Sequence, residues 1–409
     1  MRTADVVIVG AGHAGAATAV ALRQGKFRGS IVMVGEEAEI PYERPSLSKE
    51  YLAGEREFER LTLRPAQYWK DAGVDLWLGS RVTSVDASRQ CLTLADQATL
   101  GYQKLIWAAG GHPRRISCPG SDLKGVHVVR SRLDVDKMRA DLGTANRVAV
   151  IGAGYIGLEA AAVLRKLGKT VFLLEAMDRV LARVAGVDLS RFLLAEHRAQ
   201  GVNVRTEASV EALIGTDDRV SAVRLATGEV IYVDMVIVGI GIIPAVGPLR
   251  EAGAAGNNGV WVDSQCRTSL PHVYAVGDCA LHENRYAAGG AVRLESVQNA
   301  ADQGVVAARS VLGAEIQYDS VPWFWSNQYD IKLQTVGLCL GHDQAVLRGD
   351  PSSRRFSVIY LRGGRVVALD CVNASRDYLQ GRRLVADRVA ADPNRITDTT
   401  QGLKELFCS

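Results

Sequence analysis

The chain has 409 residues, of which 47% are apolar and 23% charged, and its formal net charge at pH 7 is +3. This length exceeds what one hydrophobic core usually serves, so we expect two or three domains. No apolar stretch reaches the roughly 18 residues of a membrane-spanning helix, the small net charge does not suggest nucleic acid binding, and the lack of a signal-peptide pattern predicts a cytoplasmic location.

The N-terminal segment reads as a strand, a glycine turn, a helix and a second strand. Residues 5–9 are apolar and β-branched, 10–15 read GAGHAG, and 16–23 form an Ala-rich helical stretch. The next strand, 30–34, is followed by Glu36. This order is the dinucleotide-binding fingerprint of a Rossmann-like domain.

Each residue of this fingerprint has a physical task. Gly10 makes the tight turn, Gly12 lets the backbone approach a pyrophosphate, and Gly15 lets the helix and strand pack closely. Glu36 is placed to bind ribose hydroxyls. The pattern therefore predicts one bound dinucleotide at the start of the chain.

The same pattern recurs in the middle of the chain. A strand over 147–151 leads into GAGYIG at 152–157, a helix over 158–166 and a strand over 170–174 that ends at Glu175. Two complete copies predict two dinucleotide cofactors facing each other, a flavin and a nicotinamide. The second turn supplies the nicotinamide site, with Gly152, Gly154, Tyr155, Ile156 and Gly157.

The acid that closes the second copy indicates which nicotinamide is used. A carboxylate at Glu175 accepts hydrogen bonds from a free 2′-hydroxyl and repels a 2′-phosphate, so it favours NADH over NADPH. Arg179 and Arg183 follow closely and could soften this preference.

The C-terminal segment holds the whole excess of positive charge. From residue 320 onward there are 12 Lys or Arg against 9 Asp or Glu, and the rest of the chain is balanced. Strands are expected at 332–337, 356–362 and 365–370, followed by a helix over 378–390. Arg354, Arg355, Arg382, Arg383 and Arg388 could attract an acidic protein.

These motifs resemble those of the FAD-dependent ferredoxin reductases that serve bacterial monooxygenases and dioxygenases, the putidaredoxin reductase type. The resemblance spans the chain and rests on the two glycine turns, PSLSK at 45–49, YAVGDC at 274–279, ESVQNA at 295–300 and PWFWSNQ at 322–328. It implies FAD and NAD(H) as cofactors and hydride transfer from NADH to FAD. It further implies single-electron transfer to a [2Fe-2S] ferredoxin by a monomer or weak dimer.

The resemblance also assigns site residues. It places Lys49 beside the flavin, paired with Glu159 at the end of GYIGLE, as the catalytic pair. Where the family often has a threonine, this chain reads Ala108-Ala109-Gly110, so the hydroxyl is missing. The remaining expected cofactor contacts are Ala14, Glu36, Arg44, Pro45, Val82, Ala109, Gly110, Arg130, Asp278, Glu295, Val297 and Trp323 for FAD, and Arg183 and Gly241 for NAD.

The expected fold class is α/β, with two Rossmann-like domains in a glutathione-reductase-like arrangement and a smaller α+β C-terminal domain. The FAD domain is expected to be discontinuous, over 1–111 and 239–318, with the NAD domain at 112–238. The C-terminal domain, 319–409, is expected to cover the flavin, with Trp323 and Trp325 shielding it.

The positions of the seven cysteines help to decide between competing functions. They are residues 91, 118, 266, 279, 339, 371 and 408. No two have C-x-x-C spacing, so we expect buried, reduced thiols and no metal site. A disulfide reductase needs two close cysteines in the segment 39–52, which has none. A rubredoxin reductase or NADH oxidase stays open. A non-enzymatic redox-sensing flavoprotein with a basic surface for nucleic acid is disfavoured by the pI of about 8.4.

Overall fold

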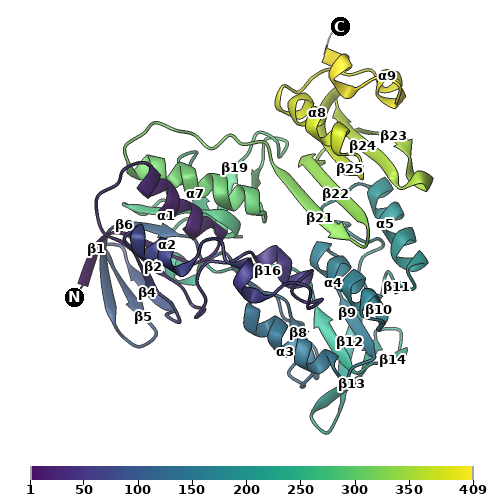
Figure 1. The fold of residues 1–409 in the computed structure, drawn as a ribbon, viewed down its shortest axis with the longest axis horizontal. Helices are drawn as coiled ribbons and strands as arrows, with labels where there is room; N and C mark the ends of the chain where they lie inside the picture. Colours follow the sequence, from purple (N-terminus) through teal and green to yellow (C-terminus); the bar gives the residue numbers. More distant parts are fainter. Residues whose placement is uncertain (1, 408–409) are drawn as a thin grey trace. The chain divides into compact units, whose positions relative to one another are not determined.

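The computed structural model describes residues 2–407 and divides into two compact units (Figure 1). Unit 1 comprises 1–44, 58–112 and 243–322, and unit 2 comprises 45–57, 113–242 and 323–409. Helices and parallel sheets alternate in both units, which confirms the α/β class. No helix within the described residues is both long and apolar enough to cross a membrane.

Unit 1 is built on a mostly parallel sheet with strand order β3-β2-β1-β6-β5-β4, and β18 pairs with the other edge of β6. Val9, Trp107 and Ala275 are register partners, so β1, β6 and β18 end at the same edge. The strands are β1 (Arg2–Val9), β2 (Ile31–Val34), β3 (Val74–Trp77), β4 (Val82–Asp86), β5 (Cys91–Leu94), β6 (Thr99–Trp107), β17 (Val260–Val262), β18 (Val273–Ala275), β19 (Ala280–Glu283) and β20 (Ala291–Val292).

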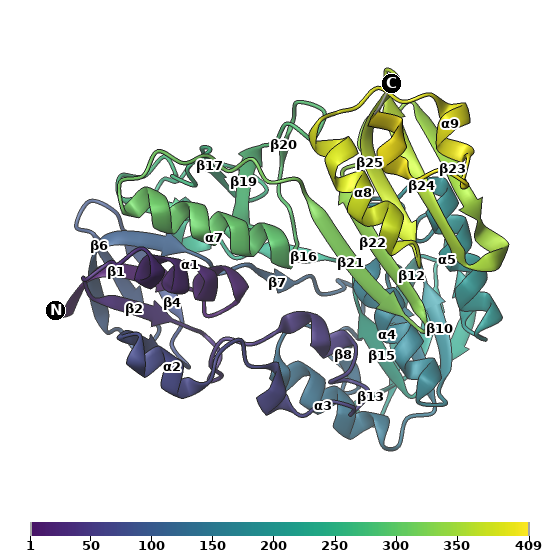
Figure 2. The same cartoon turned by 45° about the horizontal axis from the view of Figure 1, so that its top comes forward.

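Two helices of unit 1 lie side by side along this sheet, as both views show (Figures 1 and 2). Helix α1 (His13–Gln24) carries small buried residues, so α7 (Val297–Val311) can approach it closely. A Cβ at Gly304 of α7 would lie 2.8 Å from the carbonyl oxygen of Ala14, so only glycine fits there. The shorter helices are α2 (Ala66–Asp71) and α6 (Gly247–Glu251).

Unit 2 contains a second parallel sheet, with strand order β11-β10-β9-β15-β8. Beside it lies a three-stranded antiparallel sheet of β12, β13 and β14. The elements are β8 (Val126–Val128), α3 (Arg132–Leu142), β9 (Arg147–Ile151), α4 (Tyr155–Lys166), β10 (Thr170–Leu174), α5 (Val187–Ala199), β11 (Asn203–Arg205), β12 (Val210–Thr216), β13 (Arg219–Leu225), β14 (Val230–Tyr232) and β15 (Met235–Val238). The chain leaves unit 1 along β7 (Gly111–Pro113) and returns along β16 (Ile242–Pro244), and these two strands pair.

The C-terminal part of unit 2 is an antiparallel sheet, β21-β22-β25-β24-β23, with α8 packed on it (Figure 2). Three strands and the helix were expected from the sequence; β21 and β23 were not. Both are edge strands: β23 alternates exposed and buried residues, and β21 has three partly buried aromatic residues followed by three polar ones, so neither forms an apolar run of strand length. The elements are β21 (Trp323–Gln328), β22 (Ile331–Gly337), β23 (Gln344–Asp350), β24 (Arg355–Arg362), β25 (Arg365–Val372), α8 (Ser375–Ala386) and α9 (Pro393–Thr397).

Helix boundaries differ from the expectation at three places. The helices after both glycine turns begin inside the turns, at His13 and Tyr155, because each second glycine is the helix N-cap. The C-terminal helix was expected to reach residue 390 but ends at Ala386, and Arg388 then adopts a left-handed φ of 47° that no helix accommodates.

The segment 45–57 belongs to unit 2, although the sequence placed it in the FAD domain. Tyr51 donates to Asp136 Oδ1 at 2.5 Å, and Lys166 and Lys49 each form an ion pair within the unit, with Glu55 and Glu159. The three-domain division by cofactor stays a prediction.

The C-terminal sheet is fastened by Arg348 of β23, whose side chain is 5% exposed. Its guanidinium pairs with Asp377 and donates to the carbonyl oxygens of Ile396, Asp398 and Gln401. Arg348→Met should destabilise the protein by about 3–5 kcal/mol, because it leaves the partly buried carboxylate of Asp377 without its cation and three carbonyl groups without their donor. Urea unfolding measures this loss. Arg383→Met, which removes an exposed arginine paired with Asp387, should lower the free energy of unfolding by less than about 1 kcal/mol. Equal losses in the two variants would contradict the stabilising role of Arg348.

Candidate functional site

The first glycine turn is shaped by two glycines that the protein itself requires. Gly10 has a φ of 116°, and a Cβ there would overlap the carbonyl oxygen of Ala108; a Cβ at Gly15 would overlap the carbonyl oxygen of Gly10. Gly12 is different, because its Cβ would meet nothing closer than Arg44 Nε at 3.9 Å. Packing within the unit does not require glycine at this position, so the open space suits a bound group.

The second glycine turn repeats the arrangement. Gly152 has a φ of 98° and faces the carbonyl oxygen of Gly239, and a Cβ at Gly157 would overlap the carbonyl oxygen of Gly152. A Cβ at Gly154 would meet nothing within 4 Å. Each turn therefore leaves a cradle at its second glycine, as the fingerprint predicts.

Both cradles lie at helix N-termini that no side chain caps. Gly12 and Gly154 are the N-caps of α1 and α4, and neither helix has an acidic residue in its first turn. The first N–H groups and the positive end of the helix dipole are thus left for an anion. The two sites fit the diphosphates of two dinucleotides.

The acids expected to bind ribose take up different positions. Glu36 is exposed just beyond β2. Glu175 lies against the second turn, where its Oε2 accepts from the N–H of Ala153 at 2.7 Å and its Oε1 from the N–H of Met177 at 3.0 Å. A carboxylate oxygen can accept more than one hydrogen bond, so Glu175 is held in place with capacity left for ribose hydroxyls.

The two arginines after Glu175 have unequal roles. Arg179 donates to the carbonyl oxygens of Ala182 and Ala185 and to Ser190 Oγ, so it holds its own loop together. An effect of Arg179 on the preference for NADH stays a prediction. Arg183 is exposed on the same loop.

Asp278 follows β18 in the turn Gly277–Cys279, at the strand edge where the first glycine turn lies. Burial lowers the pKa of Arg44, but Tyr42 and the paired Glu37 outweigh it and raise that pKa above its ordinary value, with Asp278 adding to the effect. A permanent cation and Asp278 therefore share this edge with Gly12.

The other expected flavin residues of unit 1 lie on the elements around that edge or close to them. Gly110, with a φ of 64°, and Ala109 follow β6 directly. Glu295 forms an ion pair with Arg293 at 2.7 Å, just before α7. Val297 opens α7, and Val82 opens β4 and is buried. Pro45, Arg130, Trp323 and Gly241 belong to unit 2, and their cofactor roles stay predictions.

The expected catalytic pair is present in unit 2. Lys49 Nζ lies 2.6 Å from Glu159 Oε2, with the two side chains 11% and 1% exposed. Ser48 Oγ donates to the same oxygen at 2.7 Å, and Ser326 Oγ donates to Oε1 at 2.6 Å. The sequence did not identify either serine as a site residue, although both stand inside motifs that it singled out.

The thiols of the described residues take no part in either cradle. Within the described residues, Cys118, Cys266, Cys279, Cys339 and Cys371 form no disulfide, and Cys408 lies outside those residues. Burial raises the pKa of Cys339 to about 11 and that of Cys279 to about 12, so these thiols stay protonated. Among residues 2–407 there is no cluster of three His, Cys, Asp or Glu suited to a metal.

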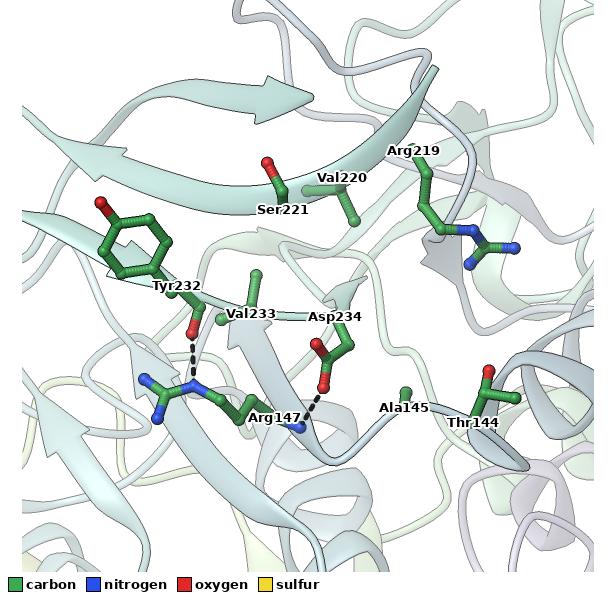
Figure 3. Close-up of a pocket in the computed structure, with 9 residues that line it drawn as sticks. All are labelled: Thr144, Ala145, Arg147, Arg219, Val220, Ser221, Tyr232, Val233 and Asp234. Carbon is green, nitrogen blue, oxygen red and sulfur yellow. Dashed lines mark hydrogen bonds between the residues drawn. The ribbon is translucent and has the colours of Figure 1, made fainter. Parts of the chain in front are cut away.

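Figure 3 shows a pocket at the opposite edge of the second parallel sheet. It lies where β9 and β15 begin, whereas the glycine turn lies where β9 ends. Arg147 Nε donates to the carbonyl oxygen of Tyr232 at 2.7 Å, and Asp234 accepts from the N–H of Arg147. Its charged side chains serve the fold, and it is not the dinucleotide site.

The sequence and structure match known proteins over their whole length. Residues 4–304 match the pyridine nucleotide-disulphide oxidoreductase family, and 323–407 match the reductase C-terminal family. The chain is 58% identical over 403 residues to the 5,5′-dehydrodivanillate O-demethylase ferredoxin reductase subunit of Sphingobium sp. (98% of each chain). It is 35% identical to rubredoxin-NAD(+) reductase of Pseudomonas putida (90% of this chain, 95% of the other). The covalent putidaredoxin reductase–putidaredoxin complex matches with a TM-score of 0.95 and 37% identity, over 100% of this chain and 99% of the other.

The assignment of the flavin to the turn at Gly12 and of NADH to the turn at Gly154 can be tested by replacing each glycine with valine. Gly12→Val should fold, because its side chain meets no protein atom closely, but it should purify without flavin. Gly154→Val should keep its flavin and bind NADH more weakly. Its dissociation constant for NADH should rise about tenfold or more, because the valine side chain displaces the phosphate from the helix N-terminus. Flavin absorbance and NADH titration measure these effects. If the Gly12→Val protein purifies with its full content of flavin, the flavin does not bind at the first glycine turn.

Proposed function

This chain belongs to the pyridine nucleotide-disulphide oxidoreductase family and carries the reductase C-terminal domain, and from this we propose that it is an NADH-dependent ferredoxin reductase. It takes hydride from NADH onto FAD and passes single electrons to a [2Fe-2S] ferredoxin of an oxygenase system. A relative at 58% identity over nearly the full chain, named as the ferredoxin reductase subunit of an O-demethylase, supports this assignment.

The observation that carries the proposal is the pair of open glycine cradles in a chain whose segment 39–52 holds Lys49 and no cysteine. Two cradles supply sites for a flavin and a nicotinamide. A disulfide reductase would need a reactive dithiol in that segment. Electrons that enter the flavin must therefore leave it directly for an external acceptor.

FAD, when bound, accepts a hydride from NADH and releases the two electrons one at a time. The protein contributes orientation and charge. The cradle at Gly12 and the cation of Arg44 hold the flavin diphosphate, and the cradle at Gly154 with Glu175 holds the nicotinamide dinucleotide. In this proposal Lys49, fixed by Glu159, supplies a positive charge where the reduced flavin accumulates negative charge.

The acceptor is bound through the C-terminal domain in this proposal. Arg354 is engaged by Glu196 and Asp330, so it contributes little to a partner surface. Arg383 is 79% exposed beside Asp387, and Arg382 lies over the ring of Trp323, with Cζ 6.0 Å from its centroid. These two arginines of α8 are the cations best placed to steer an acidic ferredoxin.

A rubredoxin is the second candidate acceptor, because a rubredoxin-NAD(+) reductase also matches at 35% identity. Stopped-flow reduction by NADH, followed by mixing with a [2Fe-2S] ferredoxin, a rubredoxin or oxygen, separates the acceptors. Ferredoxin should accelerate flavin reoxidation most. If no iron–sulfur protein exceeds the rate with oxygen, the NADH oxidase function replaces this proposal. The cytoplasmic location stays a prediction.

Cofactor choice should follow from Glu175. NADH should exceed NADPH in kcat/KM by about one to three orders of magnitude, since each tenfold step corresponds to about 1.4 kcal/mol. Glu175→Ala should bring the two nucleotides within about tenfold, because the repulsion of the 2′-phosphate is lost. Asp178→Ala, an exposed acid of the same loop, is the control and should keep the preference. Equal use of both nucleotides by the unmodified enzyme would contradict the role of Glu175.

Ferredoxin steering should depend on α8. Reversing Arg382 and Arg383 to Glu should slow ferredoxin reduction about tenfold and flatten its salt dependence, because these charges act mainly on association and are screened within about 8 Å at physiological salt. NADH reduction of the flavin, followed with ferricyanide as acceptor, should not change. Arg28→Glu with Arg89→Glu makes the same change in net charge on unit 1 and is the control. Unchanged ferredoxin turnover would place the docking surface elsewhere, for example at Arg64 or Arg309.

A further inference from the structure

A continuous chain of buried hydrogen bonds runs from the Lys49–Glu159 pair into the C-terminal domain. It passes along strand β21, which packs against helix α4 (Figures 1 and 2). Ser326 Oγ lies 2.6 Å from Glu159 Oε1, and Gln328 Nε2 lies 3.1 Å from Ser326 Oγ. His197 Nε2 on α5 lies 2.9 Å from Gln328 Oε1, and Tyr329 closes the chain with its hydroxyl 3.0 Å from His197 Nδ1.

The chemistry of the groups sets one direction for this chain. A carboxylate only accepts hydrogen bonds, so Ser326 must donate to Glu159 and then accepts from the amide NH₂ of Gln328. The amide oxygen of Gln328 therefore faces His197, which must donate through Nε2. His197 Nδ1 is left to accept from the hydroxyl of Tyr329. Every donor thus points toward Glu159.

The chain is shielded from water over most of its length. Glu159, Ser326, Gln328 and His197 are all at most 2% exposed. Burial lowers the pKa of His197, which keeps the ring neutral with one donor and one acceptor nitrogen. In such a setting each hydrogen bond strengthens its neighbour, and an unsatisfied group is costly.

We propose that Ser326 is a positioning residue of the Lys49–Glu159 pair, and that Gln328 and His197 fix the direction in which its hydroxyl donates. The inference rests on the proposed role of that pair in flavin reduction. Glu159 Oε2 takes Lys49 and Ser48, and Oε1 takes Ser326. Without the Ser326 hydroxyl the carboxylate can rotate, and the ammonium of Lys49 loses its fixed place.

The test removes the hydroxyl and separates binding from reaction. Ser326→Ala should lower the limiting rate of flavin reduction about tenfold, because misplacing a catalytic group by about 1 Å can cost up to a hundredfold. The dissociation constant of NADH should stay unchanged, since the cradle at Gly154 is not altered. The midpoint potential of the bound flavin, measured by dye equilibration, should fall, because the charge on Lys49 stabilises the reduced form less well. An unchanged limiting rate and potential would overturn the proposal.

Ser357→Ala is the matched control. Ser357 is equally buried in the same domain and donates to Asp377 at 3.0 Å, outside the chain that ends on Glu159. It should lose a similar amount of stability but keep the rate and the potential of the unmodified protein. If both serine variants slow flavin reduction alike, Ser326 has only a structural role and the proposal is wrong.

His197→Phe tests the direction of the chain. Without a donor at His197, the amide of Gln328 can turn and accept from Ser326, which then stops donating to Glu159. This variant should therefore lower the flavin potential by about half the Ser326→Ala effect or more; no change would overturn the role of His197.

Lys49→Met separates the proposed role of the Lys49–Glu159 pair from the positioning role of Ser326. If it leaves flavin reduction unchanged, the proposed role of the pair fails; if it slows reduction while Ser326→Ala does not, only the positioning role fails.

Discussion

The burial of one carboxylate, that of Glu159, constrains how unit 2 is assembled. A charge that is 1% exposed needs several donors, since desolvating an unpaired carboxylate costs several kcal/mol. Its donors come from segments far apart in the chain, Lys49 and Ser48 on one side and Ser326 on the other. The segment 45–57, helix α4 and strand β21 therefore meet at a single buried side chain, in addition to the contacts of the segment through Tyr51–Asp136 and Glu55–Lys166.

This dependence separates what the sequence could predict from what it could not. The glycine turns can be recognised locally, because Gly10, Gly12 and Gly15 stand within six residues of each other, although the carbonyl oxygen that requires glycine at position 10 belongs to the distant Ala108. Strands 147–151 and 170–174 were predicted to the residue. The link from Ser326 to Glu159 spans 167 positions. No periodicity or spacing encodes such a contact, since a serine in an edge strand has the same pattern whether or not it donates to a buried acid.

In the proposed function, a member of a family named for disulphide chemistry works without a dithiol in the segment 39–52, which holds Lys49 instead. Three of the described thiols are buried and three are partly exposed, and burial keeps those of Cys279 and Cys339 protonated near neutral pH. A protonated thiol is a poor nucleophile and does not exchange electrons with a flavin. A lysine held by a buried carboxylate supplies charge without accepting electrons. In this proposal no described thiol competes with the flavin as an electron carrier, which suits an acceptor that takes electrons singly.

In the proposed function, the C-terminal domain combines two tasks on one sheet. Strand β21 carries Ser326, and α8, which packs on β22 and β25, carries Arg382 and Arg383. Coupling between two sites requires an element with two alternative arrangements. Arg348 opposes any such rearrangement, because its buried guanidinium joins β23 to α8, to α9 and to the chain after α9. A sheet that has only one arrangement can hold Ser326 in place, but it cannot pass a conformational change from α8 to Glu159. We therefore expect partner binding at α8 and the geometry at Glu159 to be independent, so that each half-reaction keeps its own rate.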